Sequence, residues 1–238
     1  MKYLIYILTL FAFQFAFSQK DADSLPQLDL YKIALVNQTD SYITFPIDIG
    51  NIEPLMFEAN VNPSFIVRER KDSKLMAVLT PQIIIRMYNE ESYPVRTPSY
   101  IPQISFYYVA NKTEILNSLV LFGKIAHHSN GQDGRFYNED GTINLQSGNF
   151  ATNYFELGFL KTSYSNRLKA IKTIKSSIEV HPKSWMLQEL KGQYSGLRWH
   201  NTFTSFKFPL KDSQNDRANF SLKAEATIML DNFNDKDA

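Results

Sequence analysis

The chain contains no cysteine. This absence excludes a disulfide-stabilised scaffold, a thiolate metal site and a cysteine nucleophile. Beyond the first twenty residues, no apolar run approaches the roughly 18 to 20 residues that a membrane-spanning helix requires. Lys and Arg total 25 and Asp and Glu total 24. This balance lacks the basic excess that is typical of nucleic-acid-binding proteins, so no nucleic-acid partner is expected.

Aromatic residues, in contrast, are abundant. They make up 14% of the 238 residues, with 18 Phe and 13 Tyr, while Gly and Pro number only 9 and 10. This composition is typical of neither a low-complexity nor a disordered chain. The sequence therefore combines many aromatic residues with the absence of any long apolar run in its main part.

The N-terminus has the layout of a secretory signal peptide. Lys2 precedes an apolar run from Tyr3 to Phe17, and Ser18 lies just before a charged stretch. This layout predicts export, with cleavage after Ser18 and a signal peptide at residues 1–18. An uncleaved membrane anchor is the alternative interpretation. Residues 19–238 are long enough for one sizeable domain.

From about residue 28 onward, the apolar residues follow a period of two. In the segment 218–230, seven apolar residues share one face and mostly polar residues share the other, which predicts a long strand. Turn residues separate the segments of this kind. The predicted strands are 29–37, 41–49, 56–68, 75–88, 104–109, 117–129, 153–163, 171–180, 193–200, 202–210 and 218–230.

The length of these strands favours a membrane protein over a soluble sandwich. Soluble strands average about five or six residues, whereas several here have the nine to thirteen residues that a tilted strand needs to cross a bilayer. Tyr and Phe near the strand ends fit interfacial girdles. The sequence therefore predicts an all-β fold, a transmembrane antiparallel β-barrel with apolar residues facing lipid. A soluble barrel is the alternative.

One group of polar residues lies on a predicted apolar face. His127 and Ser129 are two residues apart on the strand 117–129, so they share a face on which an imidazole can act as general base for a hydroxyl. Asn153 begins the apolar face of the segment 153–163. If the two strands are neighbours, Asn153 reaches the far nitrogen of His127 and fixes its tautomer. The alternative is a polar strand end without catalytic function.

These residues resemble a known family. The sequence His-His-Ser-Asn-Gly at 127–131, followed by the asparagine at 153, is similar to the signature of the bacterial outer-membrane phospholipase A family. A second segment, EESYPVRTPSYIPQISF at 90–106, resembles another segment of that family. Arg96 within it is interpreted as structural, with Glu156 as a candidate partner.

The resemblance implies a phospholipase A1/A2, an ester hydrolase of the outer membrane that acts on glycerophospholipids and depends on Ca²⁺. It implies Ser129 as nucleophile, His127 as general base and Asn153 as orienting group, in a twelve-stranded barrel that is active as a homodimer. About nine of the twelve strands are expected in this chain, which implies truncation at its C-terminus. A non-catalytic outer-membrane barrel, serving as a channel or scaffold, is the alternative function.

The resemblance also implies the calcium ligands. Calcium prefers oxygen ligands, and the family positions correspond to the carbonyl of Gln132, to Ser92 of the partner subunit and to Asn149. Asn149 stands where the family has a hydroxyl, and the loop 130–152 is about twelve residues longer than the family pattern. The carboxylates of this loop, at Asp133, Glu139 and Asp140, are the alternative ligands.

Overall fold

The structure, a computed structural model, shows an all-β chain whose strands form one antiparallel sheet. The predicted all-β antiparallel architecture is confirmed. The expected signal peptide at 1–18 lies outside the residues that the structure describes. Those residues are 30, 34, 37–45, 54–67, 73–111, 117–165, 167–168, 170–207 and 220–231.

Ten strands make up the sheet in these residues, one more than the nine expected. Two short 3-10 turns lie between β8 and β9. The elements are β1 (Tyr42–Thr44), β2 (Leu55–Val61), β3 (Phe65–Val67), β4 (Leu75–Tyr88), β5 (Ser99–Val109), β6 (Leu119–Ser129), β7 (Ala151–Ser165), β8 (Ala170–Val180), η3 (Lys183–Trp185), η4 (Gln188–Leu190), β9 (Leu197–Lys207) and β10 (Phe220–Met229).

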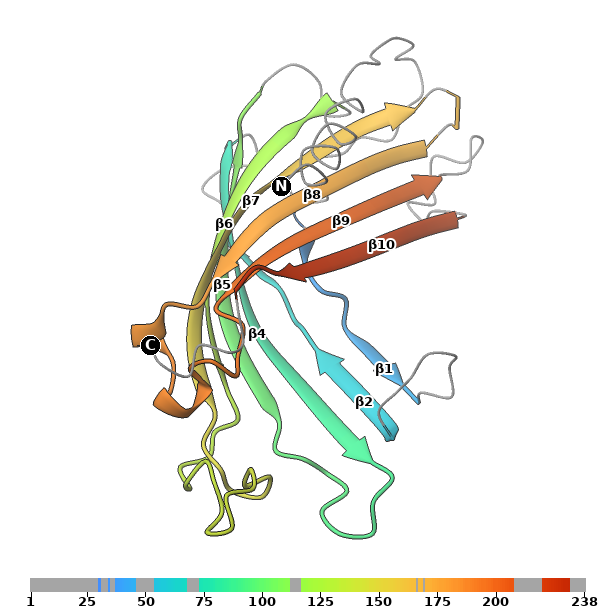
Figure 1. The fold of residues 1–238 in the computed structure, drawn as a ribbon. Helices are drawn as coiled ribbons and strands as arrows, with labels where there is room; N and C mark the ends of the chain where they lie inside the picture. The colour runs from blue at the N-terminus through green and yellow to red at the C-terminus, as the bar shows by residue number, and fades with distance from the viewer. Residues whose placement is uncertain are drawn as a thin grey trace, which may run out of the picture.

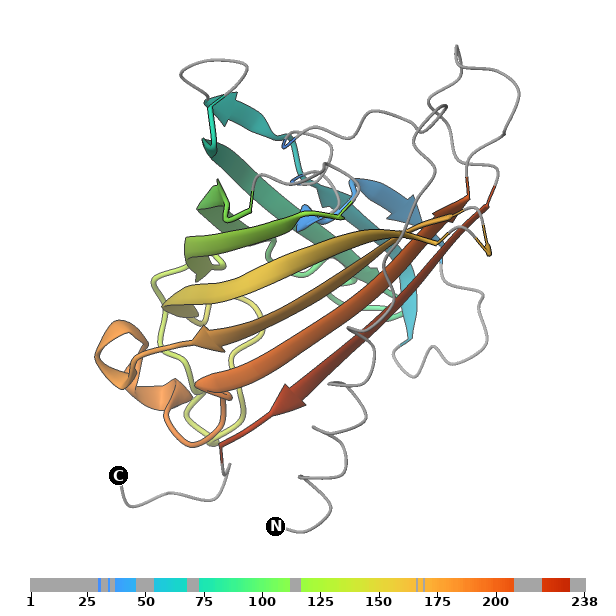
Figure 2. The same ribbon diagram turned by 90° about the horizontal axis from the view of Figure 1, so that it is seen from above.

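The sheet follows the chain as an up-and-down meander. Its order is β1-β2-β4-β5-β6-β7-β8-β9-β10, and β3 pairs with β4 beside β2. Figures 1 and 2 show the sheet curling into a trough with β1 at one edge and β10 at the other. Within the described residues the two edges do not pair, so the sheet is open. No helix among these residues is long and apolar enough to span a membrane.

The alternation of side chains gives the trough an apolar outside. Large apolar side chains from six strands, β4 to β8 and β10, share the convex face and are between 38% and 60% exposed. Large apolar side chains rarely gather on a water-facing surface in this way. These residues, which we call the convex apolar face, are Leu75, Leu79, Phe106, Tyr108, Leu121, Ile125, Leu157, Ile178, Leu222 and Ile228.

The concave side is buried and largely polar. Glu156 is 1% exposed and binds two lysines, with 2.5 Å between its Oε2 and Nζ of Lys124 and 2.9 Å between its Oε1 and Nζ of Lys175. Ser177 donates to the same carboxylate at 2.6 Å. The suggested pairing of Glu156 with Arg96 is wrong, because Arg96 pairs with Glu90 in the β4–β5 connection.

A second charged group lies further along the concave side. Oε1 of Glu179 is 2.9 Å from Nε2 of His181 and accepts a hydrogen bond from Arg198 at 3.1 Å. The other ring nitrogen of His181, Nδ1, lies 3.0 Å from the hydroxyl of Thr152 on β7. Burial of polar groups is tolerated when they are paired in this way. The concave network therefore ties β7 to the chain that follows β8.

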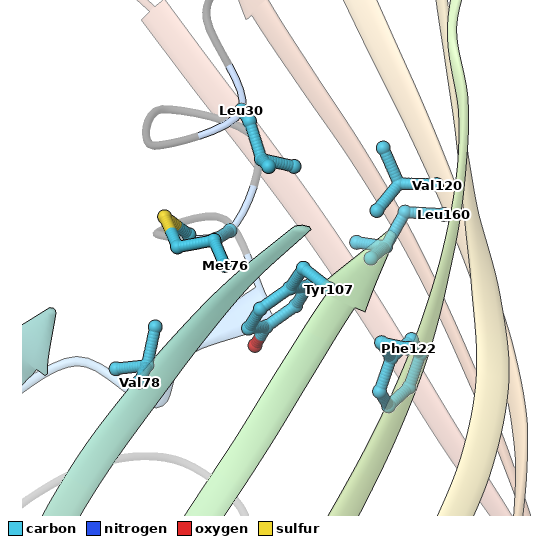
Figure 3. Close-up of a cluster of buried hydrophobic side chains, with 8 residues drawn as sticks. Leu30, Met76, Val78, Tyr107, Val120, Phe122 and Leu160 are labelled. Carbon is cyan, nitrogen blue, oxygen red and sulfur yellow. The ribbon is translucent and has the colours of Figure 1, made fainter. Parts of the chain in front are cut away.

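An apolar cluster occupies the other end of the trough. Figure 3 shows its side chains gathered on the concave side beside Leu30. Leu30 and Ala34 are helical and buried, four residues apart, where two side chains share one face of a helix. The strand predicted at 29–37 is therefore wrong at its described residues. The cluster consists of Leu30, Ala34, Met76, Val78, Tyr107, Val120, Phe122 and Leu160.

Two further strand predictions differ from the structure. The two strands expected at 193–200 and 202–210 are replaced, in the described residues, by the single strand β9 from 197 to 207, because Asn201 continues the ladder and accepts a hydrogen bond from Ser176 at 2.9 Å. The predicted strand 56–68 is divided into β2 and β3 around Pro63. Proline has no N–H to donate to a ladder, which explains the interruption.

Candidate active site on the convex face

The pairing of β6 with β7 brings two of the predicted site residues together. His127 and Asn153 are direct register partners, and Nδ1 of His127 lies 2.8 Å from Oδ1 of Asn153. Both side chains are half-buried on the convex face. The contact arises because a long connection from 130 to 150 returns the chain antiparallel to β6. The roles of these residues in catalysis stay predictions.

Ser129 shares the convex face with His127. Its register partners are Ala151 on β7 and Tyr100 on β5, so small and aromatic side chains flank the hydroxyl. Two residues of strand separate the two Cα atoms by about 7 Å, a span that a serine and a histidine side chain can bridge. Among the described residues, no hydrogen bond joins Ser129 to His127. The structure therefore places Ser129 beside the pair without a hydrogen bond to it.

The contact of Asn153 with the β8–β9 connection was not predicted. Nδ2 of Asn153 donates to the main-chain carbonyl of Trp185 at 3.2 Å. The Trp185 ring lies edge-on to Phe155, with 6.4 Å between the ring centroids. The sequence offered no signal for this contact, because a main-chain acceptor is independent of residue type.

The turn that follows Ser129 is closed by Asn130. Its Oδ1 accepts hydrogen bonds from the main-chain N–H of Gln132 at 3.2 Å and of Phe150 at 3.0 Å. Its Nδ2 donates to the carbonyl of Gly148 at 2.7 Å. One asparagine side chain therefore joins the two ends of the connection between β6 and β7, directly beside the serine. We call this arrangement the Asn130 clamp.

Glycine is required at position 131. Its φ is +69°, in the left-handed region, and a Cβ there would lie 3.2 Å from Cε2 of Tyr100. Side chains are strained in this region, and the aromatic ring leaves little room for one. Asn130 and Gly131 thus have structural roles in the turn beside Ser129.

We expect Gly131→Ala to lower the free energy of unfolding by about 1 to 2 kcal/mol, since it adds backbone strain. Gly141→Ala is the matched control, because Gly141 also has a positive φ, of +82°, but nothing lies within 4 Å of its Cβ position. Unfolding by urea measures both variants. The larger loss should occur at Gly131, and equal losses would show that the contact with Tyr100 contributes nothing.

The Asn130 clamp also holds the candidate calcium ligands of this chain. Gln132 is one of the residues that hydrogen-bond to Asn130, Asn149 lies between the other two, and the main-chain N–H of Asn149 donates to the carbonyl of Gly134 at 2.9 Å. Their carbonyl and amide oxygens fit a hard cation in donor type. Ser92 is exposed in the β4–β5 connection. The ligand assignments stay predictions.

The alternative carboxylate ligands are exposed in the loop. Asp140 accepts hydrogen bonds from the hydroxyl and the N–H of Thr142, and these bonds hold the pKa of its carboxyl below the usual value. Asp133 and Glu139 are also exposed. Across the described part of the chain, no three His, Asp or Glu side chains gather into a group that could hold a metal.

His128 points away from the site, as its position in the strand predicts. It lies on the concave side, where its ring meets Phe150 edge-on with 4.8 Å between centroids. The next aromatic contact is between Phe150 and Tyr194, at 5.7 Å. His128 therefore packs inside the trough while its neighbours His127 and Ser129 face outward.

No protein-family model, curated protein or solved structure matches this chain. The function is therefore inferred from the residues and from their geometry.

Proposed function

We propose that this protein is a phospholipid acyl hydrolase of the outer-membrane phospholipase A type, with Ser129, His127 and Asn153 as its catalytic triad. The observation that carries the proposal is the 2.8 Å contact between His127 and Asn153, beside Ser129, on the convex apolar face. Polar groups on a lipid-facing wall cost free energy, so their presence there points to a function. Reaction with a substrate that lies in the membrane is such a function.

The chemistry follows from the position of each group. His127 takes the proton of the Ser129 hydroxyl at Nε2, and Oγ attacks the carbonyl carbon of an acyl ester. The imidazolium then protonates the departing glycerol oxygen, which leaves an acyl-serine. Water, deprotonated by His127, attacks this ester; the acyl–Oγ bond breaks, His127 returns the proton to Oγ of Ser129, and the fatty acid is released. Asn153 accepts the hydrogen bond from Nδ1–H throughout and keeps the ring oriented.

The convex apolar face supports the choice of substrate. Leu121 and Ile125 precede His127 on the same side of β6, and Leu157 follows Asn153 on the same side of β7. We propose that this face meets the acyl chains of an outer membrane in a twelve-stranded transmembrane barrel. The reactive groups then lie at the end of the apolar strand segments, where ester groups of a bilayer are found.

We propose Ca²⁺ as the cofactor of this hydrolase. Held by Gln132, Asn149 and Ser92 of the partner subunit, it would supply positive charge for the oxyanion that forms during acyl transfer. The involvement of a partner residue makes the active form a homodimer. The N–H of Ser129 is the other donor that this chain offers to the oxyanion.

Fatty-acid release from phospholipid micelles by the full chain tests the proposal. We expect release in millimolar calcium and a loss of at least about tenfold when a chelator is added, because the oxyanion loses its cationic partner. Magnesium in place of calcium is the control for ionic strength. A purified, folded protein that releases no fatty acid with calcium would instead be the non-catalytic barrel that serves as channel or scaffold.

A further inference from the structure

We propose that the main-chain carbonyl of Trp185 is a positioning group, which holds the Asn153 amide and, through it, the Nδ1-protonated tautomer of His127. Its significance for catalysis rests on the proposed hydrolase function. The carbonyl belongs to the 3-10 turn η3, in the connection between β8 and β9, so the site on β6 and β7 depends on a third part of the chain.

The two contacts of Asn153 allow only one orientation of its side-chain amide. A carbonyl oxygen can only accept, so the atom of Asn153 that lies 3.2 Å from the Trp185 oxygen is the amide nitrogen. The amide oxygen must then face His127, at 2.8 Å. Because this oxygen is also only an acceptor, Nδ1 of His127 carries the proton. In the neutral ring, Nε2 is then left with its lone pair, which is the state a general base requires.

The carbonyl is well anchored relative to β7. Met186 forms a bridge with Thr152, and the N–H of Leu187 donates to the carbonyl of Ala151 at 3.1 Å. On the concave side, the hydroxyl of Thr152 lies 3.0 Å from Nδ1 of His181, which is 3% exposed. The connection therefore holds the residues that precede Asn153 both along the edge of β7 and from the concave side.

This arrangement also explains why the triad residue is an asparagine. Aspartate offers the imidazole a full negative charge, but it has no N–H to donate. At position 153, one carboxylate oxygen would lie against the Trp185 carbonyl oxygen, and two acceptors at that distance repel each other. The Trp185 carbonyl thus selects an amide at position 153.

Substitutions in this turn distinguish the contribution of the Trp185 carbonyl from that of the other groups in the turn. Met186→Pro should rotate the Trp185 carbonyl, because residues before proline avoid the helical region and Met186 has a φ of −125°. Lys183→Pro is the matched control, since Pro182 is already extended, with φ −58° and ψ 134°. Trp185→Ala removes the ring and keeps the carbonyl.

A milder variant removes one anchor without backbone strain. Leu187 has a φ of −57°, which proline can adopt, so Leu187→Pro deletes only the hydrogen bond to Ala151 and the leucine side chain. Leu187→Pro replaces Met186→Pro in the experiment if the latter does not fold. The readout is the pair of ¹⁵N imidazole resonances of His127 in the folded full chain, assigned with His127→Gln, at a pH where the ring is neutral.

We expect the wild type, Lys183→Pro and Trp185→Ala to show one fixed tautomer with Nδ1 protonated. Met186→Pro should show averaged nitrogen shifts, with Leu187→Pro between the two, and fatty-acid release should fall at least about tenfold in Met186→Pro. A wild type protonated at Nε2 would overturn the proposal, as would unchanged nitrogen shifts in the proline variants at 186 and 187. A tautomer change in Trp185→Ala would assign the effect to the ring and reject the carbonyl.

The nitrogen shifts are independent of turnover. A chain with the fixed tautomer but no fatty-acid release would contradict the hydrolase function and leave the positioning role intact. A chain that releases fatty acid while Met186→Pro keeps both the wild-type tautomer and the wild-type rate would contradict the positioning role alone.

Discussion

Replacing Ser129 with alanine is expected to lower fatty-acid release by at least about 10³-fold, because no other group can form the acyl intermediate. Binding of phospholipid should change little, since the lost hydroxyl contributes little apolar contact. The measurement is initial-rate fatty-acid release with calcium, using protein whose fold is verified by circular dichroism. An alanine variant with wild-type rates would remove Ser129 from the mechanism.

Ser205→Ala is the matched control for this experiment. Ser205 also lies on the convex side and is half-buried, but it belongs to β9 and pairs with Lys172 and Leu222. We expect it to retain wild-type release. A fluorophosphonate probe gives a second readout, because an activated serine forms a stable covalent adduct that mass spectrometry locates. Adduct formation at a serine other than Ser129 would redirect the assignment.

The largest effect on stability is expected at Glu156. Glu156→Gln keeps the shape of the side chain but leaves the ammonium groups of Lys124 and Lys175 without their counter-charge inside the trough. Removing one partner of a buried ion pair costs about 3 to 5 kcal/mol. Urea unfolding in detergent, followed by fluorescence of Trp185 and Trp199, measures this loss.

Glu225→Gln provides the comparison. Glu225 pairs with Lys223 on β10 at 2.9 Å, but its side chain is 60% exposed. An exposed pair contributes at most about 1 kcal/mol, so the unfolding midpoint should hardly move. Equal midpoints for the two variants would mean that water screens the buried charges of the concave side as fully as the exposed pair on the edge strand β10, and the trough would then be a wet channel.

The sequence predicted those strands in which apolar residues recur with a period of two on one face. The strand expected at 75–88 has the bounds of β4 in the structure, and the expected contact between His127 and Asn153 follows from the pairing of two such strands. The prediction failed where packing against other parts of the chain decided the local structure. A strand was expected at 29–37, yet Leu30 and Ala34 are helical because their four-residue spacing packs both side chains into the apolar cluster.

The missed parts of the site depend on contacts that a sequence does not encode locally. The Trp185 carbonyl has no side-chain signature, and its position depends on how the β8–β9 connection folds back over β7. The partners of Glu156 lie on both neighbouring strands, so they can be identified only once both registers are known. Arg96 was an incorrect partner because it lies in a connection rather than in a strand.

The Asn130 clamp makes the position of Ser129 independent of the length of the connection between β6 and β7. Because one side chain fastens both ends of the connection, the exposed turn at 138–142 can lengthen or shorten while Ser129 stays in place. Doubling the length of a flexible loop costs only about 0.6 kcal/mol in closure entropy. The tip of this hairpin is therefore a natural position for inserting a peptide epitope or a reporter into the protein, and evolution can vary it as freely.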